Sequence, residues 1–190
     1  MPDLASTSLA ALWLPILLAA VFVFVASSLI NMLPLWHKND FPPLPDEAAA
    51  RAAIGPLQVP PGDYMVPRCN SMKDMGSPEF KAKVNQGPNW IITAMPLGEG
   101  GMASSLLQWF LFLLLVAFFS AYVASHALPP GAHYTEVFRF VGTTAFMGFA
   151  FGQLPQSIWF RRRWSTTLKH VFDGLIYALL MAGTFGWLWP

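Results

Sequence analysis

Three polar side chains lie close together in the apolar last part of the chain: His170, Asp173 and Tyr177. Their offsets of three and seven residues place them on one face of an α-helix. Ionisable groups are costly to bury in a membrane, and those found there commonly serve ion or proton pathways. The pattern therefore predicts an ion or proton site. The simpler alternative is an ion pair between Lys169 and Asp173, four residues apart at the membrane interface.

A second group of residues offers sulfur ligands. Cys69, Met72 and Met75 follow the spacing C-x-x-M-x-x-M, and soft sulfur ligands suit Cu(I). The alternative role is packing, because methionine fills irregular gaps in apolar surfaces. Cys69 is the only cysteine, so a disulfide within the chain is excluded. These three residues form a candidate copper or redox site.

Two histidines form a third candidate. His126 and His133 flank a short Pro-Pro-Gly turn, and imidazole nitrogens bind Zn²⁺ and copper. A tetrahedral site needs more ligands than these two, and the neighbouring sequence supplies no third. The sequence therefore names no particular metal or other cofactor.

Sequence motifs of the common enzyme classes are absent. The chain has no G-x-x-x-x-G-K-[ST], G-x-G-x-x-G, H-E-x-x-H or G-x-S-x-G motif. The net charge is +1, and no basic face of the kind that binds nucleic acid is evident. We therefore expect a protein that is not an enzyme and that does not bind nucleic acid.

The elements that carry these residues are strongly apolar. Four stretches contain no Asp, Glu, Lys or Arg: residues 4–36, 100–135, 140–160 and 174–190. About 20 apolar residues in a helix cross a hydrocarbon core about 30 Å thick. Only 11% of the residues are charged, against about 25% in ordinary soluble domains. These features predict a protein embedded in the lipid bilayer.

The predicted fold is an all-α integral membrane protein with four transmembrane helices, at residues 9–33, 104–126, 135–160 and 166–189. An extramembrane connection of about 65 residues joins the first two helices. The chain then divides into a first helix within residues 1–33, a cap within residues 34–103 and three further helices within residues 104–190. The last three helices are expected to be antiparallel neighbours, because the turns between them are short.

Small residues mark two of these helices. They recur every four positions in the fourth helix and form a small-x-x-x-small pair in the third. The residues concerned are Gly174, Ala178, Ala182 and Gly186 in the fourth helix, and Gly148 and Gly152 in the third. Small residues let membrane helices approach closely. The stripe either packs these two helices together within one chain or docks another subunit or a second copy.

The connection is rich in proline and has short apolar runs. A helix with an acidic start is predicted over residues 46–53, and a second helix begins at Ser77, an N-cap residue followed by proline. A brief strand is predicted at residues 64–66, and residues 90–95 form a strand or an interface-lying segment. We expect this connection to pack over the inner ends of the transmembrane helices.

Basic residues predict the orientation in the membrane. Lys and Arg concentrate in residues 34–103 and around residues 161–165. Because cytoplasmic segments carry an excess of Lys and Arg, both segments are predicted to be cytoplasmic and both termini outside. The predicted location is the bacterial inner membrane.

The leading functional hypothesis is a non-catalytic membrane subunit or scaffold. It would bind partner membrane proteins or itself through the small-residue faces and the cytoplasmic cap. The alternative is a small transporter or channel that uses the polar cluster at the inner end of the last helix. A further alternative is a copper-binding or redox membrane protein.

Overall fold

The computed structural model describes residues 7–33, 36–98 and 101–190. The chain forms two compact units. The first combines Met1–Phe41 with Gly101–Pro190, and the second is Pro42–Gly100. The first is entirely helical in its regular structure, and the second contains short helices and a small sheet. Each unit is described by itself below.

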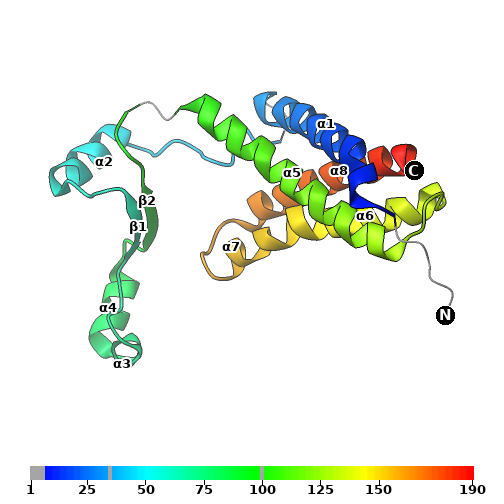
Figure 1. Ribbon diagram of the computed structural model, residues 1–190. Helices are drawn as coiled ribbons and strands as arrows, with labels where there is room; N and C mark the ends of the chain where they lie inside the picture. Colours follow the sequence, from blue (N-terminus) through cyan, green and yellow to red (C-terminus); the bar gives the residue numbers. More distant parts are fainter. Residues whose placement is uncertain (1–6, 34–35, 99–100) are drawn as a thin grey trace. The chain divides into compact units, whose positions relative to one another are not determined.

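The helical unit is a bundle of four long helices. They are α1 (Trp13–Met32), α5 (Met102–Ala127), α6 (Tyr134–Ala150) and α8 (Trp164–Leu188). These helices lie alongside one another (Figure 1), and α8 contacts both α1 and α6. The buried core is made largely of small and branched apolar side chains from all four helices, including Ala20, Leu113, Val141 and Ala178.

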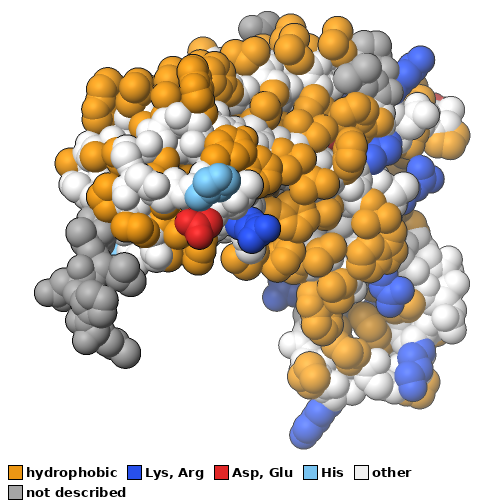
Figure 2. All heavy atoms as spheres, turned by 90° about the vertical axis from the view of Figure 1, so that its right-hand side faces the viewer, with side chains coloured by type: hydrophobic (Ala, Val, Ile, Leu, Met, Phe, Trp, Pro, Cys, Tyr) orange, Lys and Arg blue, Asp and Glu red, His pale blue; other side chains and the backbone are white. Residues whose placement is uncertain are grey.

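Three helical segments are long and apolar enough to cross a membrane: Leu9–Met32, Met102–Ala127 and Trp164–Leu188. The first of them includes a 3₁₀ turn (Leu9–Leu12) ahead of α1. Less than half of each apolar window is buried inside the protein, so most of its apolar side chains face outward. Hydrophobic side chains also cover much of the face drawn in Figure 2, where Lys and Arg side chains are concentrated toward the right and the bottom of the view. Outward apolar surface of this extent is typical of helices surrounded by lipid.

The third predicted helix, over residues 135–160, is not continuous. α6 has 17 residues and is followed by a 3₁₀ turn (Phe151–Gln153) and the short helix α7 (Leu154–Ile158). Pro155 explains this break. It has no N–H, and in a continuous α-helix its ring would collide with the carbonyl four residues earlier, which is where the α-helical geometry ends. α6 alone is therefore shorter than the roughly 20 residues that span a bilayer.

Glycines bring α6 and α8 together in antiparallel orientation. A Cβ atom added at Gly186 would lie 2.7 Å from the ring of Tyr134, which begins α6. One added at Gly174 would lie 3.1 Å from Cβ of Phe149, near the end of α6. The two helices can approach this closely at both ends only because glycine has no side chain at these positions.

The other small residues also lie inside the bundle, with one exception. Ala178 and Ala182 are buried, and a Cβ at Gly148 would be 3.4 Å from Val116 of α5. Gly152 has no atom within 4 Å of such a Cβ. The predicted stripe is thus occupied by contacts within this chain at every position except Gly152.

The second unit contains α2 (Glu47–Ile54), a 3₁₀ turn (Gly55–Leu57), β1 (Gly62–Val66), α3 (Met72–Met75), α4 (Pro78–Gln86) and β2 (Trp90–Ala94). Asp46 caps α2 by accepting a hydrogen bond from the Ala49 N–H, and Ser77 caps α4 through the Phe80 N–H. Both predicted helices are therefore present. β1 and β2 form an antiparallel two-stranded sheet. β1 contains the strand predicted at residues 64–66, and β2 corresponds to the strand that was one of two alternatives for residues 90–95. The all-α fold class describes the helical unit only.

Apolar side chains occupy both faces of this sheet. Val66 pairs with Trp90 on one face, and Met65 pairs with Ile91 on the other. All four are exposed, and no residue of 42–98 is buried. An isolated two-stranded sheet is only marginally stable in water. The second unit therefore has defined secondary structure but no hydrophobic core of its own.

Candidate functional site

Asp173 is the centre of a polar cluster at the beginning of α8. Its side chain is on the inward face of the helix, and the residue is only 3% exposed. The segment that follows α1 reaches it. The Trp36 indole N–H donates to Oδ1 at 2.9 Å, and His37 Nε2 lies 2.8 Å from Oδ2. Each carboxylate oxygen of Asp173 thus has a partner, as a buried charge requires.

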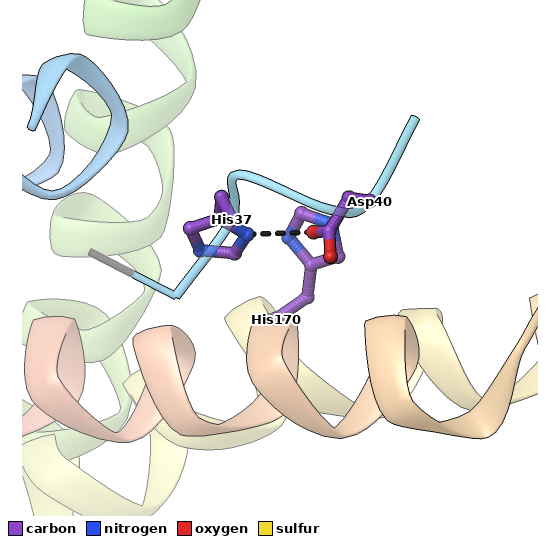
Figure 3. A group of neighbouring side chains, drawn as sticks. All are labelled: His37, Asp40 and His170. Atoms are coloured by element: carbon purple, nitrogen blue, oxygen red, sulfur yellow. Dashed lines mark hydrogen bonds and ion pairs between the residues drawn. The ribbon is translucent and has the colours of Figure 1, made fainter. Parts of the chain in front are cut away.

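His37 bridges two carboxylates. Its Nε2 faces Asp173, and its Nδ1 lies 2.7 Å from Oδ2 of Asp40. The Asp40 N–H donates to the His37 carbonyl, and this turn places both side chains on the same side (Figure 3). A neutral imidazole has only one N–H. A neutral His37 can therefore donate a hydrogen bond to only one of the two acids.

Lys169 completes the pairing of Asp40. Its Nζ lies 2.6 Å from Oδ1 of Asp40. Burial would by itself raise the pKa of Asp40, but the hydrogen bonds and charges of Lys169 and His37 outweigh it and hold the pKa below its ordinary value. Asp40 is thus a carboxylate in the folded protein. The predicted pair between Lys169 and Asp173 is replaced by pairs that each residue makes with the segment after α1.

His170 lies beside this network. Arg162 approaches its Nε2 at 3.0 Å, and Nδ1 is 3.8 Å from Oδ2 of Asp173. A guanidinium group only donates hydrogen bonds, so Nε2 of His170 accepts and the ring proton is on Nδ1. The rings of His37 and His170 are close, with their centroids 5.2 Å apart. Figure 3 shows His170 rising from α8 toward Asp40.

Tyr177 lies one turn further along α8, on the same face as Asp173. It is buried, and its ring packs edge-on against Phe149 and Trp109, at centroid distances of 5.5 and 6.3 Å. The structure thus places the three predicted residues of α8 on one face of the helix, with Asp173 and Tyr177 buried and His170 half-buried. His170 and Asp173 are in the polar cluster, and Tyr177 is in the aromatic layer next to it.

The predicted metal ligands elsewhere are engaged in local contacts. Cys69 donates to the Ser71 carbonyl, and Met72 and Met75 are exposed. His126 Nδ1 is 2.8 Å from the Tyr122 carbonyl oxygen, and His133 caps α6 by accepting from the Thr135 N–H. None of them joins the one group of three or more His, Cys, Asp or Glu ligand atoms found within the described residues, which is His37, Asp40 and His170.

Trp36, His37 and Asp40 were not predicted as members of this site, and Arg162 was expected only to lie near Asp173 as part of the run Arg161–Arg163. The first three follow α1 and lie more than 120 residues from α8 in sequence, so no spacing rule connects them to Asp173. The available signal was the predicted topology, which puts the end of the first helix and the beginning of the fourth at the same membrane boundary. Polar residues that follow the first helix could therefore have been expected to contact polar residues near the start of the fourth.

The fold and the site together define a multi-pass helical membrane protein with a buried ionic cluster at one end of its bundle. The chain matches no protein-family model, and no curated protein or solved structure shows significant similarity to it.

Proposed function

We propose that this protein is a non-catalytic membrane subunit whose helical unit anchors it in the bilayer and whose connection binds a partner membrane protein. The observation that carries the proposal is the state of residues 42–98. They have capped helices and a paired sheet, yet none of them is buried. Folding of so short a segment needs apolar burial to offset the lost chain entropy.

The hairpin formed by β1 and β2 is the proposed docking surface. Val66 and Trp90 on one face, and Met65 and Ile91 on the other, expose apolar groups that water solvates poorly. Both strands also keep an unpaired edge within the described residues, and an edge is a template for a further strand. A protein partner can satisfy both features at once.

The small-residue stripe supports this location of the docking surface. Apart from Gly152, its glycines and alanines are covered by α5 and α6 within the chain, so the stripe offers little surface to another subunit. Residues 42–98 carry five acidic and five basic side chains, whose charges cancel. An apolar contact is therefore a better basis for partner binding than net charge.

The proposed topology has four passes, with both termini outside and residues 34–103 and 161–165 in the cytoplasm of a bacterial cell. α6, its 3₁₀ turn and α7 would make the third pass. In support, Trp189 at the end of α8 donates to the Pro129 carbonyl at 3.0 Å, and Ser157 in α7 lies 2.7 Å from Thr167 near the start of α8. The α6–α7 segment thus runs alongside the whole of α8.

Photo-crosslinking tests the docking surface. A benzophenone amino acid at position 65 or 90, on opposite faces of the hairpin, should give an adduct with the same partner protein in native membranes. The matched control is position 47, which is exposed on α2 of the same unit; its adduct should be at least about tenfold weaker, because contact falls off within a few ångströms. Equal adducts at all three positions, or adducts only with the helical unit of the same chain, would contradict the proposal.

The buried cluster favours a second candidate function, a small ion or proton transporter. Asp173 is an intramembrane acid joined through His37 to Asp40, and such chains of ionisable groups occur in proton pathways. A transporter of this kind would need the charge of Asp173 for flux. The Asp173→Asn variant described in the Discussion separates this candidate from a structural role of the cluster.

A further inference from the structure

His37, Asp40 and His170 converge from two segments that are far apart in sequence. One ligand atom of each lies within 4.8 Å of the others. His37 and Asp40 come from the turn after α1, and His170 comes from the second turn of α8 (Figure 3). The set provides two imidazole nitrogens and one carboxylate oxygen, which is a ligand combination typical of divalent zinc and related first-row metals.

The pairing of His37 leaves one ring nitrogen facing Asp40 and available to a metal ion. When its Nε2–H donates to Asp173, at 2.8 Å, the lone pair of Nδ1 faces Oδ2 of Asp40 at 2.7 Å. Two acceptors at that distance repel unless a proton or a metal ion lies against both. Histidine ligands in metal sites commonly donate their other ring N–H to a carboxylate in this way.

The other carboxylate oxygen of each acid, Oδ1, also accepts a hydrogen bond. Lys169 binds Oδ1 of Asp40 at 2.6 Å, and the Trp36 indole binds Oδ1 of Asp173 at 2.9 Å. These contacts orient the residues and leave Oδ2 of Asp40 directed at His37. Such supporting contacts fix ligand geometry in metalloproteins and influence affinity.

We propose that His37 Nδ1, Asp40 Oδ2 and His170 form a three-ligand site for a divalent first-row transition metal such as Zn²⁺. Ligand atoms about 2.0–2.2 Å from a tetrahedral zinc lie roughly 3.3 Å apart. The widest pair in this group, at no more than 4.8 Å, therefore closes by about 1.5 Å at most. The pair His37 Nδ1 and Asp40 Oδ2, now 2.7 Å apart, opens by about 0.6 Å. The fourth position is left for water or a ligand from outside the chain. The site is separate from the docking surface on residues 42–98 and does not depend on it.

Arg162 is the local competitor for this site. Its guanidinium occupies Nε2 of His170 at 3.0 Å and keeps the ring proton on Nδ1. Because Arg162 holds Nε2, we take Nδ1 as the ligand atom of His170. Binding of a metal at Nδ1 moves this proton to Nε2, and Arg162 must then turn away from the ring. Arg162→Gln should therefore raise zinc affinity several-fold, whereas loss of a residue that only orients a ligand lowers it.

Zinc binding to the untagged, full-length protein in mild detergent tests the site. Competition with a chromophoric chelator should give one Zn²⁺ per chain, and His37→Gln, Asp40→Asn or His170→Gln should weaken binding at least about tenfold. The matched controls are His126→Gln and His133→Gln, since the chain has four histidines and these two lie outside the cluster. They should leave zinc affinity unchanged.

A measurement on the double variant His126→Gln/His133→Gln keeps the test valid if a ligand variant fails to fold. This protein retains only His37 and His170 as histidines, so X-ray absorption of its zinc complex should show two imidazole ligands. Fewer than two, no zinc retained by the wild type, or an equal loss of affinity in the His126 and His133 variants would overturn the proposal.

Discussion

Replacement of Asp173 by alanine is expected to lower the free energy of unfolding of the helical unit by about 3–5 kcal/mol, because it removes one member of a buried ionic network and leaves its partners without their acceptor. The indole N–H of Trp36 and the ring of His37 would both lose their acceptor. With Asp173 only 3% exposed, water cannot replace the lost hydrogen bonds. The midpoint of thermal unfolding in mild detergent should fall by roughly 6 °C or more.

The exposed acid Glu136 provides the control. It lies in the first turn of α6, in the same unit, and Glu136→Ala should cost no more than about 1 kcal/mol, the value of a helix-dipole interaction at a surface. Equal effects of the two alanine variants would show that the network around Asp173 contributes nothing specific to stability.

The isosteric variant Asp173→Asn distinguishes a structural cluster from a transport pathway. Its side-chain oxygen still accepts from Trp36, and its NH₂ can donate to Nε2 of a His37 that carries its proton on Nδ1. We therefore expect it to recover much of the stability lost in Asp173→Ala. Under the subunit proposal, vesicles with wild-type protein show no proton flux above empty vesicles. A wild-type flux that Asp173→Asn abolishes would instead establish the transport candidate.

Gly174→Val is expected to have the next largest effect, a loss of about 1–3 kcal/mol or more through overpacking. Even the first added carbon would lie 3.1 Å from Cβ of Phe149 and 3.4 Å from its carbonyl carbon. Backbone cannot swing aside as a side-chain end can, so α6 and α8 must separate. Thermal unfolding in detergent measures the loss, and Gly174→Ala should give an intermediate value.

Gly183→Ala is the matched control, because the same helix carries both glycines. Its added Cβ would be 3.7 Å from the Tyr134 hydroxyl, an ordinary van der Waals contact. This variant should be neutral or slightly stabilising, since alanine is a better helix residue than glycine. If Gly183→Ala were as harmful as Gly174→Val, close α6–α8 packing would not be the cause.

Charge-free stretches and helix caps made much of the secondary structure predictable. The segments at residues 9–33, 104–126 and 166–189 correspond closely to the three long apolar helices of the structure. Asp46 and Ser77 marked the starts of α2 and α4. The break at Pro155 was missed because the third helix was predicted from the absence of charged residues alone. Proline interrupts the backbone hydrogen bonds of a helix even where every side chain is uncharged.

The candidate site was predictable only in part. Helical spacing placed His170 and Asp173 on one face, since that relation is local. The turn that carries His37 and Asp40 comes to α8 through tertiary packing of α1, which no local pattern encodes. For the same reason, the small-residue stripe could be recognised from sequence, but whether α6 or another chain covers it could not.

We propose that the connection between α1 and α5 holds a partner through its hairpin. Native mass spectrometry after gentle detergent extraction tests it most directly, with the double variant Met65→Ser/Trp90→Ser as the comparison. We expect the wild type to carry a second protein chain at fixed stoichiometry, and the variant to lose this chain while its helical unit unfolds at an unchanged temperature. A wild-type protein that is a lone monomer in every mild detergent, or a variant that keeps its partner, would rule out docking through the hairpin.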